Sequence, residues 1–493
     1  MTPAQCAAEA FRPAFHYSPD RNWMNDPNGL VWYDGEYHLF YQYNPLGTDW
    51  GNMSWGHAVS PDLQAWEELP VAIPCSDSER IFSGSIVVDQ ANTAGFGAEH
   101  EPALVALYTS VYARSGLQAQ SLAYSTDRGR TWTKYKGNPV LDRNSSDFRD
   151  PKVFWYAEGG YWVMVVVLAV ERIAQFYRSA NLIDWEHLSD FATGNPADGI
   201  WECPDLFELP VGGAAEHTRW VLVISVNPGA PAGGSGTRYF IGDFDGKVFT
   251  PDEAADDAWL DYGADCYASV SFNDAPGGER VLIGWMNNWA YARGIPTSSF
   301  RGSMTLPRTC TLARVDGRIL LVQRPVGPGS SLREPEPGVE LRDALIPEGI
   351  TPLPQTAHGE ALEIRAEFTI GSAERFGLHL RESGPQRTVV GYDTRSGSLF
   401  IDRAASGNLA FHDAFAAVHH GPLAADENRV RVTVYVDAAS IEVFGGRGEC
   451  VLTDQVFPDG DGRACSLFAE GGAVTVNYLE VTRLRTASPP GSP

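Results

Sequence analysis

The stretch that decides the fold is Ser60-Pro-Asp-Leu-Gln-Ala-Trp66, because the chain repeats it. It returns as Ser179-Ala-Asn-Leu-Ile-Asp-Trp185, and a looser copy with one extra residue covers 125–132. Segments in which a glycine turn precedes an aromatic, apolar strand also recur, at 34–41 and 158–165. A β-hairpin unit that is used several times is the expected cause of such repeats.

The spacing of these units predicts a β-propeller. Units of four short strands at intervals of about 50 to 65 residues, without a sustained helical period, are typical of propeller blades. Residues 11–325 have room for about five such blades. A large β-sandwich is the alternative, but it would not explain the repeated turn before tryptophan. Many glycines (50) and prolines (33) also fit an all-β chain with frequent turns.

The sequence changes character after residue 325. Residues 326–345 are rich in proline, glycine and charge, which is typical of an interdomain linker. Alternation typical of strands then resumes in four segments, at 361–370, 431–436, 440–444 and 473–481. We therefore predict an all-β protein with a five-bladed β-propeller over 11–325, a β-sandwich over 346–485 and a disordered tail over 486–493.

Charge limits the kinds of partner. Acidic residues outnumber basic residues by 62 to 37, which gives a formal net charge of -25. Such a surface repels phosphate backbones and anionic headgroups, so neither nucleic acid nor a membrane is an expected partner. A neutral sugar needs no electrostatic steering, and the 14 tryptophans offer flat faces for stacking on it. The longest apolar run, 162–170, is too short for a membrane helix and predicts one buried strand.

The cysteines and the first residues give weaker information. Seven cysteines are scattered without a C-x-x-C pair or clustering with histidine, so no metal site is predicted. Their odd number gives no disulfide framework, although Cys450 and Cys465 could meet across neighbouring strands. The segment MTPAQCAAEA lacks the features of a signal peptide, which is either absent or already removed. We favour an extracellular over a cytoplasmic location, and the oligomeric state stays open.

Three segments place a carboxylate near a proline: WMNDPNG (23–29), FRDP (148–151) and WECPD (201–205). Proline favours extended backbone in the residue before it and removes a ladder donor, so Asp26 and Asp150 should have extended geometry and lie where a strand begins or breaks. The ends of the inner strands of a propeller converge on its axis, which would bring Asp26, Asp150 and Glu202 into one pocket. Any one of them alone would be an ordinary turn residue. Three together repel one another, which indicates acid–base chemistry or a metal, but the EF-hand spacing of a calcium site is absent.

Two carboxyl groups with different pKa values can cleave a glycosidic bond with retention of configuration. Glu202, between Trp201 and Cys203, has the more apolar neighbours, which should raise its pKa and suit an acid/base. Asp26 lies beside amide and turn donors and should stay ionised as a nucleophile. Asp150, next to Arg149, should bind sugar hydroxyls through hydrogen bonds that strengthen in the transition state.

These segments, in this order, resemble the signature segments of the invertase and fructanase family, glycoside hydrolase family 32. Further segments that match it are HLFYQYNP (38–45), WGNMSWGHA (50–58), FSGS (82–85), YFIGDFDG (239–246), DCYA (265–268), IGWMNNW (283–289) and VDAASIEVF (436–444). The resemblance covers residues 15–480 and implies a five-bladed propeller followed by a sandwich, without a metal or organic cofactor. A related five-bladed family acts on arabinans, but WMNDPNG together with FSGS favours fructose.

The resemblance also implies roles for single residues. Asp26 would be the nucleophile, Glu202 the acid/base and Asp150 the stabiliser of the transition state. The residues implied to line a fructose pocket are Asn25, Gln42, Trp50, Phe82, Ser83, Arg149 and Trp285, together with Asp265, which is the weaker candidate because Cys266 stands where an aromatic residue is common. From composition alone, Phe82 and Trp285 would be core residues and Ser83 a turn serine. Three histidines are expected to be structural: His16, His38 and His57.

The function predicted from these residues is that of a retaining, exo-acting β-fructosidase. It would release terminal non-reducing β-D-fructofuranosyl units from sucrose or from fructans such as levan and inulin through a fructosyl-enzyme intermediate. The segment 286–308 resembles bacterial and fungal exo-fructanases more than plant invertases. A transfructosylating enzyme of the same family, such as a levan fructotransferase, is the alternative, because the three carboxylates do not distinguish water from sugar as acceptor. A non-catalytic fructan-binding lectin is the third reading.

Overall fold

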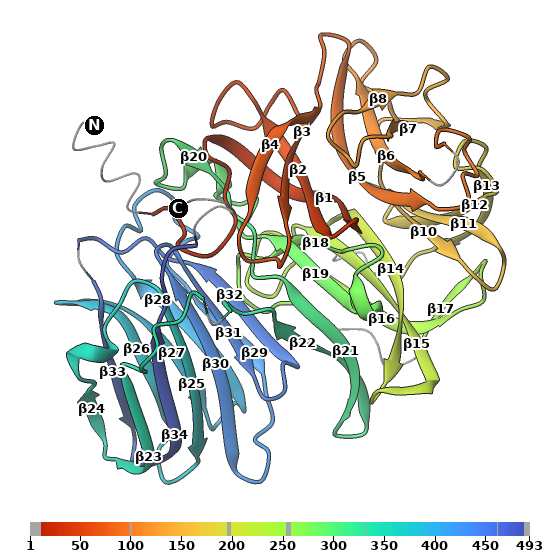
Figure 1. Cartoon of the computed structure of the whole chain (residues 1–493). Coiled ribbons are helices and arrows are strands. Elements are labelled where there is room, and N and C mark those ends of the chain that lie inside the picture. The colour runs from red at the N-terminus through yellow and green to blue at the C-terminus, as the bar shows by residue number, and fades with distance from the viewer. Residues whose placement is uncertain are drawn as a thin grey trace.

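A computed structural model describes residues 11–98, 101–194, 199–252, 258–329, 331–460 and 462–487, except for the side chains of 214–216. These residues form strands almost throughout, with three short 3-10 helices: η1 (Pro276–Gly278), η2 (Ala292–Gly294) and η3 (Gln355–Ala357). Figure 1 shows two bodies, an N-terminal propeller in red to green and a C-terminal sandwich in teal to blue. The predicted all-β class is confirmed. Within the described ranges, no helix has the length and apolar character needed to cross a membrane.

The first three blades are separate antiparallel sheets. Blade one contains β1 (Asn22–Tyr33), β2 (Glu36–Asn44), β3 (Ser54–Ser60) and β4 (Glu67–Ile73). Blade two contains β5 (Glu79–Asp89), β6 (Ala103–Tyr112), β7 (Gln118–Ser125) and β8 (Thr133–Lys134), with β9 (Leu141–Ser145) paired to β7. Blade three contains β10 (Phe148–Tyr156), β11 (Tyr161–Leu168), β12 (Ile173–Ser179) and β13 (Glu186–Phe191).

The last two blades share one sheet, because Val211 and Leu312 form a parallel bridge between them. Blade four contains β14 (Ile200–Val211), β15 (Ala214–Asn227), β16 (Gly236–Phe244) and β17 (Phe249–Pro251). Blade five contains β18 (Tyr267–Ser271), β19 (Arg280–Trp285), β21 (Arg308–Val315) and β22 (Arg318–Pro325). The inner strands contact one another in a ring, from β1 to β5, β10, β14, β18 and back to β1. The short strand β20 (Phe300–Arg301) pairs with the start of β1 and ties the end of the propeller to its beginning.

The repeated sequence that predicted the blades is the turn between the third and fourth strands of blades one to three. In each copy the serine hydroxyl donates to the Asp or Asn two residues later, at 3.1 Å from Ser60, 2.7 Å from Ser125 and 3.1 Å from Ser179. The indole nitrogens of Trp132 and Trp185 donate to backbone carbonyls within the same turn. The repeat is therefore kept by local hydrogen bonding that Ser, Asx and Trp side chains supply.

The C-terminal domain is a sandwich of two six-stranded antiparallel sheets around a continuous apolar core. One sheet has the order β23 (Val339–Ile346), β34 (Val474–Arg483), β25 (Leu362–Thr369), β30 (Arg429–Asp437), β31 (Ser440–Gly445) and β32 (Cys450–Gln455). The other has the order β24 (Gly349–Pro352), β33 (Ala464–Glu470), β26 (Arg375–Ser383), β27 (Gln386–Asp393), β28 (Ser398–Ala405) and β29 (Val418–Pro422).

Two expectations about this domain need correction. Strand β23 pairs with β34 and lies mostly inside the range 326–345 that was predicted to be linker, so the sandwich begins at Val339. Cys450 and Cys465 do not meet, because β32 and β33 belong to different sheets, and both thiols are free. Most of the predicted disordered tail, 488–493, lies outside the described residues.

Buried charges join the two domains. The ring of His16 contacts two carboxylates of the sandwich, Asp437 at 2.7 Å and Glu442 at 2.8 Å. Burial alone would lower the pKa of His16, but these carboxylates outweigh it and raise the pKa to about 9. Glu442 also accepts from Arg308 of the propeller at 2.7 Å. Because all these side chains are buried, the interface depends on their mutual pairing.

Candidate active site

A cavity of about 180 Å³ lies where the inner strands of the propeller begin. Asp26 lies near the start of β1, Asp150 near the start of β10 and Glu202 near the start of β14, and all three line this cavity. The other residues around it are Asn25, Gln42, Trp50, Phe82, Ser83, Arg149, Ile200, Asn227, Trp289 and Arg293. The structure thus brings together the three carboxylates and six of the residues expected to line a sugar pocket.

Breaks in strand pairing aim these side chains at the axis. The register of β1 shifts between Met24 and Pro27, that of β10 between Arg149 and Lys152, and that of β14 between Glu202 and Asp205. The inner strand β5 has a shift at Phe82 and Ser83 as well. A bulge leaves one residue unpaired and turns its side chain. At three of these places a proline, which has no backbone N–H to donate, favours the bulge. The prediction that Asp26 and Asp150 lie where their strands break is confirmed. The extended geometry predicted for Asp150 is wrong, because its φ of 67° is left-handed in spite of the proline that follows it.

Asp26 is partly buried, and its carboxylate oxygen Oδ1 is fully enclosed. Its Oδ2 accepts a hydrogen bond from the Ser83 hydroxyl at 2.9 Å and a weaker one from the Cys203 thiol at 3.7 Å. Among the described residues its Oδ1 has no hydrogen-bond partner. Burial, helped by the charge of Glu202, raises the pKa of Asp26 to about 6. Hydrogen bonding by Asn25 and Ser83 lowers the pKa of Asp26, as the expected neighbouring donors should, but burial outweighs it.

Glu202 sits between strong donors rather than among apolar groups. Its Oε1 lies 3.1 Å from both Nε and Nη2 of Arg149, and its Oε2 accepts a hydrogen bond from the hydroxyl of Tyr267. The expectation of apolar surroundings is therefore wrong, because Trp201 packs against Phe191 and the thiol of Cys203 lies between Asp26 and Asp150. The side chain of Glu202 is 20 % exposed, against 5 % for that of Asp150.

Asp150 is held in a strained conformation beneath them. Its φ of 67° lies in the left-handed region, which a non-glycine residue adopts only when its surroundings enforce it. Here its backbone N–H donates to Thr109 at 2.9 Å, and its Oδ2 accepts from the backbone N–H of Cys203 at 3.0 Å. Burial raises the pKa of Asp150 to about 7, an effect that Arg149 opposes and Glu202 strengthens.

The floor of the cavity is closed by a buried ion pair. Beneath Asp150 there is only a void of about 20 Å³. Lys152 then contacts Asp205 at 3.3 Å and donates to the carbonyl of Ser271, while the backbone N–H of Ser271 donates to Asp205. Within the described part of the chain, the cavity that holds the three carboxylates is therefore closed at its floor.

Comparison with known proteins identifies the family. The profile described as glycosyl hydrolases family 32 N-terminal domain matches residues 16–325, and the profile of the family's C-terminal domain matches 334–483. The chain belongs to glycosyl hydrolase family 32. It is therefore a glycoside hydrolase, as the residues predicted.

Relatives of this family 32 enzyme cover nearly the whole chain. It is 46 % identical to the levanase of Bacillus subtilis (strain 168) over 97 % of this chain and 71 % of that protein. It is 43 % identical to the extracellular exo-inulinase of Aspergillus ficuum over 94 % of this chain and 93 % of that protein. The crystal structure of exo-inulinase from Aspergillus awamori superposes with a TM-score of 0.93 at 41 % identity, covering 97 % of this chain and 99 % of that one. The β-fructofuranosidase of Schwanniomyces occidentalis, complexed with fructosyl-erythritol, superposes with a TM-score of 0.87 at 31 % identity over 97 % and 98 %.

Two predicted pocket residues of the family 32 enzyme lie elsewhere. Trp285 is fully buried behind the cavity, packed against Trp23 and Trp289 with ring centroids 6.0 and 4.8 Å away. Asp265 is fully buried at the domain interface, where it accepts from Tyr291 and pairs with Arg403 of the sandwich, both at 2.6 Å. Neither lines the cavity.

Sequence reasoning missed six residues at the site, among them Ile200 and Asn227 of the cavity lining. Tyr267 lies in the segment DCYA, which the resemblance indicated only through Asp265, and Cys203 has an apolar character in sequence that gives no sign of its role. Burial and the surrounding carboxylates raise the pKa of the Cys203 thiol well above its usual range, so it stays a neutral donor between Asp26 and Asp150. Trp289 and Arg293 at the cavity mouth come from the loop after β19, and Arg293 lies over the ring of Trp50. Aromatic enrichment in IGWMNNWAY was the available signal for this loop.

Proposed function

We propose that this family 32 enzyme is a retaining, exo-acting β-fructosidase that releases terminal non-reducing fructofuranosyl units from fructans such as levan and inulin and from sucrose. The observation that carries the proposal is the blind cavity with three carboxylates at the propeller axis. The names of its relatives, levanase, exo-inulinase and β-fructofuranosidase, support fructose as the sugar. Extracellular relatives also support a secreted enzyme.

Asp26 and Glu202 divide the reaction between them. Asp26 attacks the anomeric carbon of the fructosyl unit while Glu202 gives its proton to the departing oxygen, so the glycosidic bond breaks as a fructosyl-enzyme ester forms. Glu202 then takes a proton from water, which attacks the same carbon, and Asp26 leaves. Arg149 and Tyr267 fix both oxygens of Glu202, so its position is set before substrate arrives.

Asp150 and Arg149 suit the transition state. Positive charge develops on the sugar ring as the bond breaks, and a buried carboxylate below the ring stabilises it without reorganisation. Two hydrogen bonds fix this carboxylate in spite of the strained backbone of Asp150: Thr109 accepts from its backbone N–H, and the backbone N–H of Cys203 donates to its side chain.

The shape of the cavity explains exo action. A closed floor and a volume of about 180 Å³ leave room for one sugar ring and not for the middle of a chain. Only a chain end can therefore present a glycosidic bond to Glu202, which lies toward solvent. An open groove would be needed to cut within a chain.

The test is release of sugar by single variants. Asp26→Ala and Glu202→Ala should each fold and lose at least about 1000-fold of kcat on sucrose and levan, because they remove the nucleophile and the acid/base. The exposed Glu186 provides a control, and Glu186→Ala should keep full activity. Undiminished activity of Asp26→Ala would contradict the assignment.

Product chromatography distinguishes the two remaining readings. Fructose as the sole product from levan, inulin and sucrose supports hydrolysis. Longer oligosaccharides from concentrated sucrose would show transfer to a sugar acceptor instead, and sugar binding without any product would show a lectin.

A further inference from the structure

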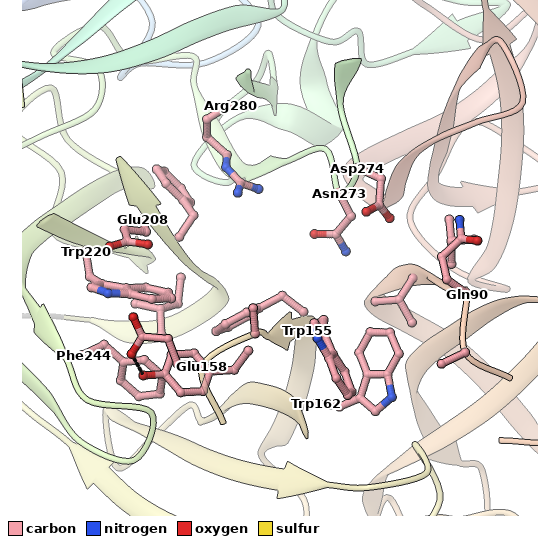
Figure 2. Close-up of a pocket in the computed structure, with 18 residues that line it drawn as sticks. Gln90, Trp155, Glu158, Trp162, Glu208, Trp220, Phe244, Asn273, Asp274 and Arg280 are labelled. Carbon is pink, nitrogen blue, oxygen red and sulfur yellow. Dashed lines mark hydrogen bonds between the residues drawn. The ribbon is translucent and has the colours of Figure 1, made fainter. Parts of the chain in front are cut away.

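A second and larger cavity lies at the opposite end of the propeller axis (Figure 2). Its volume is about 690 Å³, against about 180 Å³ for the catalytic cavity, and the two share no lining residue. It is bounded by the far ends of inner strands: Val88 on β5, Tyr156 on β10 and Glu208 on β14. Asp150, which lines the catalytic cavity, and Trp155, which lines the far one, are five steps apart on β10, which corresponds to roughly 17 Å.

The two cavities do not communicate. The amide of Asn273 donates to the carbonyls of Ile86 at 2.8 Å and Val153 at 3.0 Å, and so closes the axis between the blades. The Lys152–Asp205 pair lies between this amide and the catalytic carboxylates. A ligand in the far cavity would therefore be bound independently of the catalytic reaction.

Aromatic rings form the walls of the far cavity. Trp155 is 44 % exposed, although its neighbour on β10, Tyr156, is buried. Trp162 packs against it with centroids 5.0 Å apart and an interplanar angle of 72°, which holds the exposed indole in place. Figure 2 shows these two rings on one side and Trp220 with Phe244 on the other. Rigid indoles at the edge of a solvent-filled cavity are suited to stacking on the apolar face of a ring.

The polar groups of this cavity are mainly acceptors. Glu158, Glu208 and Asp274 contribute carboxylates, and Gln90 an amide. Arg280 is the single cation in the lining; its Nη1 donates to Ser271 and Phe272, while its buried Nε has no hydrogen-bond partner among the described residues. Three carboxylates against one guanidinium repel an anion, whereas hydroxyl groups can donate to all the acceptors.

Ring geometry favours a sugar over an organic cation. A cage for a quaternary ammonium needs several ring faces around one point. Here Trp220 packs directly on Phe244 and Phe154, with centroids 5.2 and 5.7 Å apart, so these rings form one continuous wall. The large volume also suits several linked rings better than a small cation.

We propose that the far cavity is a second, non-catalytic site that binds a neutral oligosaccharide, with Trp155 as the surface on which a sugar ring stacks. The choice of a fructan chain as the ligand rests on the proposed function. Such a site would hold the enzyme on its polymer while chain ends reach the catalytic cavity on the opposite face.

The experiment uses Asp26→Asn protein labelled with 5-fluorotryptophan, in which the Trp155 resonance is assigned through Trp155→Phe. Short inulin-type and levan-type oligosaccharides are titrated while the fluorine spectrum is recorded. A saturable shift of the Trp155 resonance is expected. Calorimetry on the same background should detect two binding events, of which Trp155→Ala weakens one at least tenfold and Trp155→Phe largely preserves both. Val248, equally exposed at 44 % but outside the cavity, supplies the control Val248→Ala.

Activity separates this site from the catalytic one. In the otherwise native enzyme, Trp155→Ala should leave kcat/KM for sucrose unchanged and raise KM for polymeric fructan several-fold. A silent Trp155 resonance, or a shift with tetramethylammonium but not with oligosaccharide, would overturn the proposal. Sucrose cleavage by Asp26→Asn would instead refute the assignment of Asp26 as the nucleophile. The shift of the Trp155 resonance would then still decide whether the far cavity binds an oligosaccharide.

Discussion

The Ser83 hydroxyl should set the pH at which Asp26 can act. It donates to Asp26 Oδ2 at 2.9 Å, while Oδ1 has no partner among the described residues. This hydrogen bond stabilises the ionised carboxylate and so opposes the burial that raises its pKa to about 6. Ser83→Ala removes the donor and leaves the carboxylate buried, and the pKa of Asp26 should therefore rise.

The size of the effect follows from the strength of the bond. A hydrogen bond to a charged group contributes about 1.5 to 3 kcal/mol, and one pKa unit corresponds to about 1.4 kcal/mol. The protonated carboxyl also accepts from Ser83, so roughly half of that energy distinguishes the two forms. The pKa of Asp26 should rise by about one unit, to roughly 7.

The assay is the pH dependence of kcat/KM for sucrose, whose acid limb reports the free enzyme. Because Asp26 must be ionised to attack, the native limb should fall about tenfold per pH unit below about 6, and the Ser83→Ala limb should lie about one unit higher. Asp150 titrates in the same range, so the displacement of the limb is the readout and not its midpoint. Any loss of sugar binding lowers kcat/KM equally at all pH values.

Ser85→Ala is the matched control on the same strand. The Ser85 hydroxyl donates to the carbonyl of Pro151 at 3.0 Å and accepts from the backbone of Val153, without touching a carboxylate. This variant should lose stability but keep the native limb. An unmoved limb in Ser83→Ala, or one at lower pH, would refute the reasoning.

Three further predictions concern stability and the domain interface. Folding raises the pKa of Asp26 from 3.8 to about 6, so ionised Asp26 destabilises the fold above pH 6. Asp26→Asn should therefore add up to about 3 kcal/mol to the free energy of unfolding at pH 8 and nothing below pH 3.8. Equal denaturation midpoints of the variant and the native enzyme at pH 8 would contradict this. Folding raises the pKa of His16 from 6.5 to about 9, so protonated His16 stabilises the fold fully below pH 6.5, and this stabilisation disappears as the pH rises through 9. Denaturant titrations should show that the free energy of unfolding falls by about 3 kcal/mol between these pH values. In His16→Gln this pH dependence should be absent. Arg403 donates to the hydroxyl of Tyr291, which belongs to the loop that carries Trp289 at the cavity mouth. Arg403→Met should therefore raise KM for sucrose about tenfold, and Tyr291→Phe should raise it less. A lower melting temperature with an unchanged KM would show that Arg403 has a purely structural role.

The sequence predicted the parts of the site that depend on local backbone chemistry. A proline beside Asp26 or Asp150 predicts a break in the strand, and the register shifts of β1 and β10 occur at these prolines. The repeated turn at Ser60 likewise predicts the blades, because its hydrogen bonds join residues only two apart in the sequence, Ser60 and Asp62. Such signals need no knowledge of the rest of the chain.

Residues whose roles depend on contacts between distant blades could not be assigned in this way. Tyr267 reaches Glu202 from 65 residues away, and nothing in its own segment indicates that partner. Asp265 beside it has a partner at 138 residues' separation, Arg403, which belongs to another domain. The raised pKa of Asp26 has the same origin: the donors near it in sequence lower this pKa, but burial by distant parts of the propeller outweighs them.

The closed floor beneath Asp150 also decides how the enzyme travels along a polymer. With Lys152 and Asp205 blocking the axis, the shortened chain and the fructose must both leave through the mouth, and the chain leaves first because water must reach the fructosyl-enzyme. The chain must withdraw after every cut before the sugar can depart and a new end can enter. We therefore expect many chains to shorten together, one residue at a time, rather than a few to be consumed from end to end.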